Sequence, residues 1–148
     1  MSIAGVTIAP LGKFEDYRGV LLHMMRADAA AFERFGEIYF SGVREGAVKA
    51  WRKHRSLTSN LAVPVGSIRL VLFDARPDSP TQGKTMTIEM GEKHYQRVTI
   101  PPGIWTGWKG LGPGMSLVAN LATEPHDPDE VESLSADSPI VPHRWQSG

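Results

Sequence analysis

Short apolar runs separated by turn residues follow one another along most of the chain. Breaks rich in proline or glycine lie at 76–80, 101–103 and 110–114, and turn residues recur about every eight to twelve positions, which is the spacing of a β-sandwich or barrel. The pattern therefore predicts an all-β fold. Strands are predicted at Gly19–Arg26, Glu37–Ser41, Ala47–Arg52, Thr58–Val65, Ser67–Asp74, Thr85–Met90, Tyr95–Ile100 and Met115–Ala122.

Two segments depart from the strand pattern. Ala27–Phe35 (ADAAAFERF) predicts a short helix with Asp28 as its N-cap, and Asp127–Glu132 predicts a single helical turn. The rest of the tail, 124–148, is expected to run extended and to pack on the barrel. Because no stretch has the composition of a linker and 148 residues fit one domain, we expect a single domain over 1–148.

Composition narrows the partners and the compartment. The 16 Lys and Arg residues balance the 16 Asp and Glu residues, so no basic patch predicts nucleic acid or an anionic membrane as a partner. The chain has no cysteine, which excludes disulfides, thiolate ligands and thiol nucleophiles. The first residues have neither a basic start nor a long apolar run, and no segment approaches the roughly 20 apolar residues of a spanning helix. A cytoplasmic location is therefore expected.

Two regions resemble the paired motifs of the cupin fold, a jelly-roll β-barrel. The first is Gly46–His54, with Gly66 closing the following hairpin, and the second is Ile100–Trp108. In metal-binding cupins the first motif carries His-x-His and then an acidic residue, and the second carries Pro-x-Gly and then a third His. The resemblance implies a cupin barrel for this chain.

Most of the cupin metal ligands are replaced in this sequence. Arg52 stands at the first His position, Thr58 at the acidic position and Thr106 at the third His position, so only His54 remains. A guanidinium repels a cation and has no lone pair to donate to it. The barrel is therefore expected to bind neither a metal nor another cofactor.

A narrower resemblance runs nearly the length of the chain. Its elements are, in chain order, Phe14-x-Asp16-x-Arg18-Gly19, Gly46–Trp51, Asp74-x-Arg76-x-x-Ser79-Pro80-Thr81, Ile100-Pro101-Pro102-Gly103 and Asp127-Pro128-x-Glu130. They are similar to motifs of the dTDP-4-dehydrorhamnose 3,5-epimerase family, with Lys49 in the place of an arginine. The resemblance implies a swapped-strand homodimer that acts on a nucleotide-linked 4-keto sugar. Such chemistry needs a base, a cation that stabilises the enolate, and an acid on the other face.

The catalytic positions of that family hold other residues here. Arg52 occupies the position of the family's histidine base, Asn120 lies near that of its tyrosine acid, and Ser59 lies near that of its lysine. The family also pairs its base with an aspartate near the C-terminus, for which the sequence offers no obvious equivalent. The residues of the family's mechanism therefore cannot be transferred one by one.

The strand that carries Arg52 offers a substitute. Residues two apart on an extended strand point to the same face, about 6.6 Å from each other, so Arg52 and His54 both enter the barrel if the strand is regular. The pKa range of histidine suits a base, and Arg52, with Asn120 nearby, could stabilise an enolate. By the same parity Lys49 faces the other way unless a bulge intervenes.

Further polar and aromatic residues are candidates for substrate binding, and each has an ordinary structural alternative. Arg18 and Arg76 flank loops and could hold a diphosphate, or they could be solvated charges. Trp105 and Trp108 could stack on a sugar or base, or pack at the barrel mouth. The remaining candidates are Lys49, Asn60 and Thr106, and Asn60 and Asn120 could equally be core amides with satisfied hydrogen bonds.

The leading hypothesis is a sugar-nucleotide epimerase or isomerase that moves a proton next to the carbonyl of a nucleoside-diphosphate 4-keto-6-deoxy sugar, with His54, Arg52 and Asn120 as catalytic residues. The alternative is a sugar- or nucleotide-binding cupin that has lost catalysis, which the replaced residues favour. A metal-dependent oxygenase or isomerase is a third hypothesis, and metal in the purified protein would support it.

Overall fold

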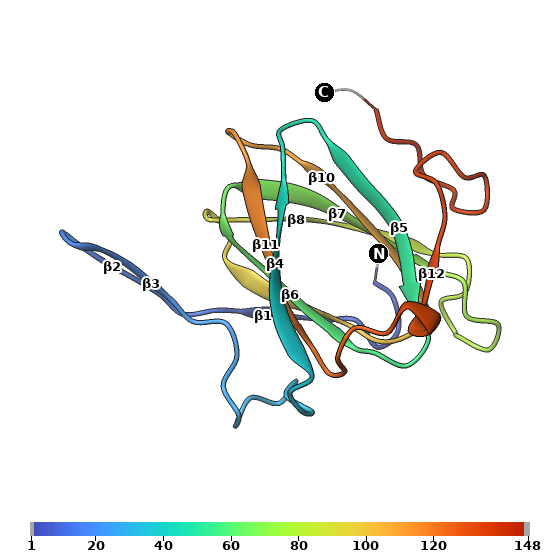
Figure 1. Cartoon of the computed structure of the whole chain (residues 1–148), viewed down its shortest axis with the longest axis horizontal. Coiled ribbons are helices and arrows are strands. Elements are labelled where there is room, and N and C mark those ends of the chain that lie inside the picture. Colours follow the sequence, from blue (N-terminus) through green and yellow to red (C-terminus); the bar gives the residue numbers. More distant parts are fainter. Residues whose placement is uncertain (1, 147–148) are drawn as a thin grey trace.

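Two antiparallel five-stranded sheets face each other in the computed structural model, which describes residues 2–146 (Figure 1). The first sheet has the order β1-β9-β6-β11-β4 and consists of β1 (Thr7–Pro10), β9 (Gln96–Ile100), β6 (Ser59–Val65), β11 (Ser116–Ala122) and β4 (Glu37–Val43). The second has the order β12-β5-β10-β7-β8 and consists of β12 (Val131–Ser133), β5 (Val48–His54), β10 (Ile104–Gly110), β7 (Ser67–Asp74) and β8 (Thr85–Gly91). The predicted all-β jelly-roll architecture is confirmed.

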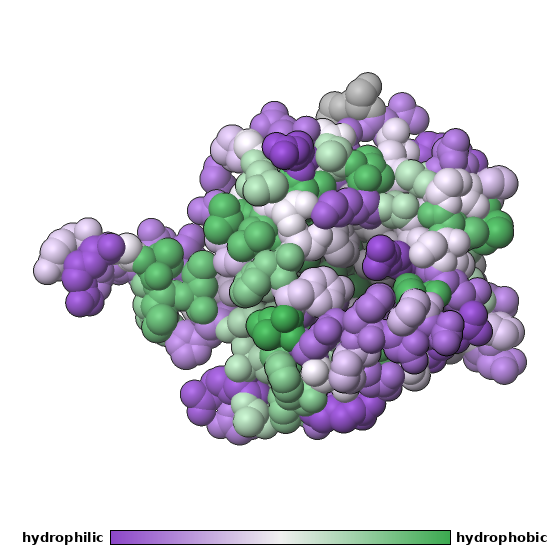
Figure 2. All heavy atoms as spheres, in the orientation of Figure 1, coloured by the Kyte–Doolittle hydropathy of each residue, from purple (hydrophilic) through white to green (hydrophobic). Residues whose placement is uncertain are grey.

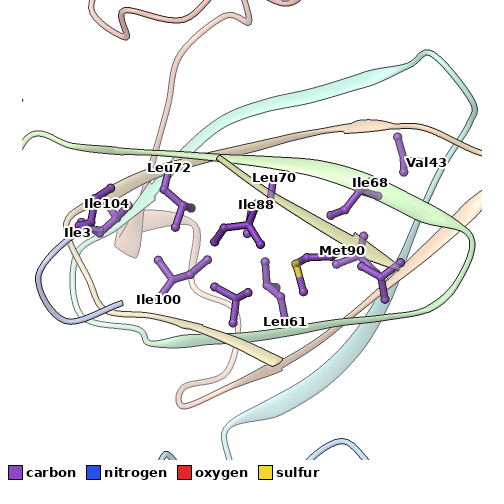
Figure 3. Packing of buried hydrophobic residues seen from close by; sticks show 13 residues of the cluster. Ile3, Val43, Leu61, Ile68, Leu70, Leu72, Ile88, Met90, Ile100 and Ile104 are labelled. Atoms are coloured by element: carbon purple, nitrogen blue, oxygen red, sulfur yellow. The ribbon is translucent and has the colours of Figure 1, made fainter. Parts of the chain in front are cut away.

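The apolar core lies between the two sheets. Ile68, Leu70 and Leu72 on β7 are fully buried, as the two-residue period of a strand requires for one inward face. Figure 3 shows them packed against Ile88 and Met90 of β8 and facing the opposite sheet. Trp108 is partly buried and packs against the edge of this cluster. The core therefore fills part of the barrel and leaves the region beyond Trp108 for other side chains.

The C-terminal tail covers the outer face of the second sheet. Strand β12 pairs with β5, and the backbone of Trp51 exchanges two hydrogen bonds with Leu134, of 2.9 and 3.0 Å. The indole Nε1 of Trp51 donates to the carbonyl of Ala136 at 3.2 Å. Val141 is fully buried in the cluster that Trp51 forms, and Trp145 packs beside it. This second apolar cluster fixes the tail along β5 (Figure 1).

A hairpin projects away from the barrel. It consists of β2 (Lys13–Asp16) and β3 (Gly19–Leu22), which within residues 2–146 pair only with each other. Four of its large side chains are exposed, namely Phe14, Tyr17, Val20 and Leu21. Figure 2 shows a hydrophobic group on the part of the projecting segment that lies nearer the barrel.

The predicted strands are confirmed within a few residues, and β7 matches its predicted range. Gly19–Arg26 is too long, because β3 ends at Leu22. Four strands were not predicted, namely β1, β2, β10 and β12. Strand β10 (IWTGWKG) was missed because glycine, which is depleted in strands, occurs in it twice, although tertiary pairing on both sides holds it in the sheet.

The predicted helix at Ala27–Phe35 is wrong, because this segment forms turns and bends. The carboxylate of Asp28 binds Arg26 at 2.8 Å and is not a cap, and so short a helix is marginal without an apolar face to bury. The single helical turn in the tail is confirmed. It is a 3-10 helix, η1 (Pro128–Glu130), capped by Asp127, whose side chain accepts from the backbone N–H of Asp129 at 3.0 Å.

The loop between β7 and β8 is organised around the buried carboxylate of Asp74. This carboxylate accepts hydrogen bonds from Arg76 Nε at 2.9 Å and from the hydroxyls of Ser79 and Thr81, both at 2.6 Å. Burial by itself would raise the pKa of Asp74, but these hydrogen bonds lower it by more than burial raises it. The net pKa of Asp74 therefore lies well below its usual value. Arg76 also donates to the carbonyl of Ala4, which ties the N-terminal segment to the loop.

We expect Val141→Ala to destabilise the protein by about 2 kcal/mol, because it opens a cavity under the tail. Ile140→Ala is the matched control, since Ile140 is 59% exposed and its truncation should change stability by less than about 0.5 kcal/mol. Urea unfolding followed by tryptophan fluorescence measures both variants. Equal effects would contradict the packing of the tail.

We expect Asp74→Asn to cost about 2 to 3 kcal/mol at neutral pH, because the Arg76 guanidinium loses its buried counter-charge. The folded-state pKa of Asp74 is depressed, so its contribution is complete well above the usual value of 3.8 and is lost as the pH falls below it. The stability of the variant should therefore fall less steeply below pH 3.8 than that of the wild type. Asp78→Asn, at an exposed position of the same loop, should behave like the wild type in acid urea titrations.

Candidate active site

A cavity of about 420 Å³ opens between the two sheets. This volume lies in the usual range for small-molecule sites. One wall comes from the first sheet, and its side chains are Tyr39, Ser41, Ser59, Leu61 and Asn120. The facing wall comes from the second sheet, and its side chains are Lys49, Ala50, Arg52, His54, Thr106 and Trp108. Polar and charged groups therefore meet at the border of the apolar core.

Strand β5 supplies three of the charged or titratable side chains through a β-bulge. Arg52 pairs with Thr106 and Lys49 pairs with Trp108, so three steps along β5 match two steps along β10. The extra residue reverses the alternation between Lys49 and Arg52. Lys49, Arg52 and His54 consequently all line the cavity. For a regular strand we expected Lys49 to point away from the cavity. The bulge is present, however, and it turns Lys49 toward the cavity.

His54 is paired with a carboxylate from the tail. Its Nδ1 lies 2.8 Å from Oε1 of Glu130, and the two side chains are 21% and 10% exposed. With Nδ1–H donated to Glu130, the neutral ring keeps the lone pair on Nε2. The sequence offered no obvious equivalent of the family's C-terminal aspartate, and the structure places the carboxylate of Glu130 beside His54. The matched motif Asp127-Pro128-x-Glu130 was the signal that could have identified it.

The carboxylate of Glu130 is held by more than the imidazole. Its Oε2 accepts from the backbone N–H groups of Ser56 at 3.1 Å and Leu57 at 2.9 Å. Burial raises the pKa of Glu130, but the hydrogen bonds from His54, Ser56 and Leu57 lower it more, so the net pKa is below the usual value. Glu130 is therefore a fixed anion beside His54 at neutral pH.

The cavity carries two cations without a carboxylate partner. Lys49 Nζ donates to the hydroxyl of Ser41 at 2.9 Å, and within residues 2–146 neither Lys49 nor Arg52 forms a salt bridge. Ammonium and guanidinium groups bind phosphate and carboxylate oxygens strongly when the site excludes water. The electrostatics of the cavity therefore favour an anionic ligand.

The opposite wall contains a hydrogen-bonded pair, Asn120 and Tyr39, of which only Asn120 was predicted from the sequence. Asn120 Nδ2 donates to Tyr39 Oη at 2.9 Å, and the two residues pair directly across β11 and β4. Asn120 was a predicted site residue, whereas Tyr39 and Ser41 were not. Their alternation on β4 was a possible signal, but the sequence does not show which strand lies beside β11.

Of the predicted site residues, Arg52, His54, Asn120, Lys49, Thr106 and Trp108 line the cavity together. Thr106 hydrogen-bonds the carbonyl of Ile104 at 3.3 Å, and Trp108 is half-buried between the cavity and the core.

The other four predicted residues lie elsewhere. Asn60 is buried with its amide satisfied, since Nδ2 donates to the carbonyl of Leu121 at 3.0 Å and Oδ1 accepts from Thr99 at 2.7 Å. Trp105 faces the tail, and Lys53 Nζ lies 5.0 Å from its ring centroid. Arg76 belongs to the Asp74 loop, and Arg18 pairs with Asp16 at 2.7 Å on the projecting hairpin.

The described residues were also compared with the requirements of a metal site and of a membrane-spanning helix. Across residues 2–146, no three His, Asp or Glu side chains come together in a geometry that could hold a metal ion. None of the helical segments in the same range has the length and apolar character needed to cross a membrane.

Comparison with known proteins points to one family. A sequence model of the dTDP-4-dehydrorhamnose 3,5-epimerase family matches residues 1–147. The chain is 34% identical to the probable low-salt glycan biosynthesis epimerase Agl13 of Haloferax volcanii, over 99% of this chain and 96% of that protein. It is 29% identical to the spore coat polysaccharide biosynthesis protein SpsL of Bacillus subtilis, over 98% of this chain and 97% of that protein.

Similarity to solved structures points to the same family. A dTDP sugar isomerase from Desulfovibrio desulfuricans is 40% identical, with a TM-score of 0.95 over 97% of this chain and 92% of that one. NovW, a 4-keto-6-deoxy sugar epimerase from Streptomyces spheroides, superposes with a TM-score of 0.89 at 20% identity, over 100% of this chain and 78% of that one. The second likeness concerns the fold alone. The predicted cupin-type barrel is thereby confirmed.

Proposed function

The chain belongs to the dTDP-4-dehydrorhamnose 3,5-epimerase family, and we propose from this that it is a sugar-nucleotide epimerase or isomerase that acts on a nucleoside-diphosphate 4-keto-6-deoxy sugar. The observation that carries the proposal is the cavity, where the His54–Glu130 pair lies beside the cations Lys49 and Arg52, which form no salt bridge within residues 2–146. A base next to cations is what proton removal beside a carbonyl requires.

In the proposed mechanism, His54 Nε2 removes the proton from the carbon next to the carbonyl. The electron pair of that C–H bond forms a carbon–carbon double bond, and the carbonyl oxygen takes the negative charge. The Glu130 carboxylate holds the ring in the required tautomer and stabilises the imidazolium that forms. Arg52 stabilises the enolate oxygen through its permanent charge.

The remaining cavity residues position the substrate. Lys49 is suited to a phosphate oxygen or to the enolate, and Trp108 offers its ring for stacking on the sugar or base, with Thr106 between the two. The amide nitrogen of Asn120 is already engaged with Tyr39, so we assign Asn120 a positioning role.

We also propose a homodimer in the cytoplasm, as the family resemblance implies. The exposed apolar residues of the projecting hairpin support a dimer, because Phe14 and Leu21 are 61% and 59% exposed. Phe40 on the outer strand β4 is 61% exposed as well. In a dimer that exchanges these hairpins, Arg18 could reach a nucleotide diphosphate in the partner's cavity.

The first test is proton NMR in D2O with dTDP-4-keto-6-deoxyglucose and the purified protein. The wild type should place deuterium at C3 or C5, and His54→Ala should slow this exchange by at least about 10²-fold because the base is lost. His94→Ala is the control, since His94 is exposed outside the cavity.

The other outcomes of this test separate the alternatives. Broadening of the substrate lines without exchange in the wild type would favour a binding protein that has lost catalysis. Neither binding nor exchange would reject this substrate class.

Glu130→Gln should lower kcat by about 10²-fold with little change in KM, because the charge that stabilises the imidazolium is removed while the shape is kept. Glu132→Gln is the matched control. Glu132 lies on β12, is 39% exposed and pairs with Lys53 outside the cavity, so kcat should be unchanged. Steady-state kinetics of both variants measures the difference, and equal rates would remove Glu130 from the mechanism.

A further inference from the structure

We propose that Tyr39 is the acid that returns the proton to the face of the sugar opposite His54. The inference rests on the proposed function and adds to it the residue that inverts the configuration. An epimerase must protonate the enolate from the face opposite the base, because protonation by the same base from the same face regenerates the substrate. The position where the family resemblance places a tyrosine acid holds Asn120, which has no proton of suitable acidity.

Tyr39 and His54 lie on opposite walls of the cavity. Tyr39 comes from β4 in the first sheet, whereas His54 comes from β5 in the second, and both line the same 420 Å³ space. A flat enolate held between the two sheets therefore presents one face to the imidazole and the other to the phenol. Figure 1 shows β4 and β5 on opposite sides of the barrel opening.

The hydrogen bonds of Asn120 leave the phenolic proton free for transfer. The backbone N–H of Asn60 can only donate, and its acceptor at 3.2 Å is Asn120 Oδ1, so the orientation of the amide is fixed. Asn120 Nδ2 must then donate to Tyr39 Oη, at 2.9 Å. Among residues 2–146 no group accepts a hydrogen bond from the Tyr39 hydroxyl, which leaves its proton for a ligand in the cavity.

The same contact prepares the residue for its charged form. When Tyr39 gives its proton to the enolate carbon, the electron pair of the double bond forms the new C–H bond and the carbonyl is restored. The phenolate oxygen retains the N–H donor of Asn120, which stabilises the negative charge. His54 then carries the proton removed from the substrate, and exchange with water returns both groups to their starting forms.

The roles of tyrosine and asparagine are thus exchanged across one strand pair. Tyr39 and Asn120 face each other in the β4–β11 register, where directly opposed side chains have Cβ atoms roughly 5 Å apart. A phenol that projects from either strand can therefore serve the same part of the cavity. This placement makes Tyr39 a catalytic residue and Asn120 its positioning residue.

The test follows exchange and inversion separately in D2O, with dTDP-4-keto-6-deoxyglucose, for the wild type and Tyr39→Phe. The variant should lower the formation of epimerised product by at least about 10²-fold. It should still place deuterium into recovered substrate with retained configuration, within about threefold of the exchange rate of the wild type, because His54 remains. Tyr95→Phe, outside the cavity, is the control and should epimerise like the wild type.

The other outcomes distinguish a failure of the proposed function from a failure of the role assigned to Tyr39. If the wild type neither exchanges nor inverts, the proposed function is wrong. If the wild type inverts and Tyr39→Phe inverts equally fast, only the role of Tyr39 is wrong. Exchange and inversion falling together in the variant would also overturn the acid role, because Tyr39 would then act in binding or in formation of the enolate.

Discussion

The pairing of strand β5 with the C-terminal tail holds the candidate active site together. Strand β5 carries Lys49, Arg52 and His54, and it would be the outer strand of its sheet if β12 did not pair with it. The tail also buries Trp51 from the outside and brings Glu130 to the imidazole. One strand pairing thus sets both the position of His54, the base that we propose, and its carboxylate partner, so a segment far along the chain belongs to the candidate site.

The barrel divides its interior between an apolar core and a charged cavity. Leu61 and Trp108 form the border, since each contacts the core and also lines the cavity. Water screens Lys49 and Arg52 while the cavity is open, but a bound sugar nucleotide would displace that water and strengthen their attraction to its oxygens. The cation pair therefore costs little in the free protein and contributes most when a ligand is bound.

We propose spatial substitutes for the replaced family residues, from other strands and from the tail. In the proposed mechanism, Glu130 on η1 supplies the carboxylate beside the base, and Tyr39 on β4 supplies the phenol beside the enolate. Paired strands make such exchanges possible, because cross-strand neighbours reach nearly the same point in space from distant places in the sequence. A list of missing motif residues therefore does not by itself exclude the proposed proton transfer in this cavity.

The sequence by itself determined the all-β class, most strands, the family and the placement of His54 and Arg52 in the cavity, because alternation, turn residues and motif spacing are local properties. It failed at Ala27–Phe35, where helix propensity was not supported by packing, and at β10, where packing overrode a weak local pattern. Only the tertiary structure decided the direction of Lys49, the Glu130 partner and the Tyr39–Asn120 pair. Each depends on strand register or on a contact between segments distant in sequence, and local residue preferences do not encode those.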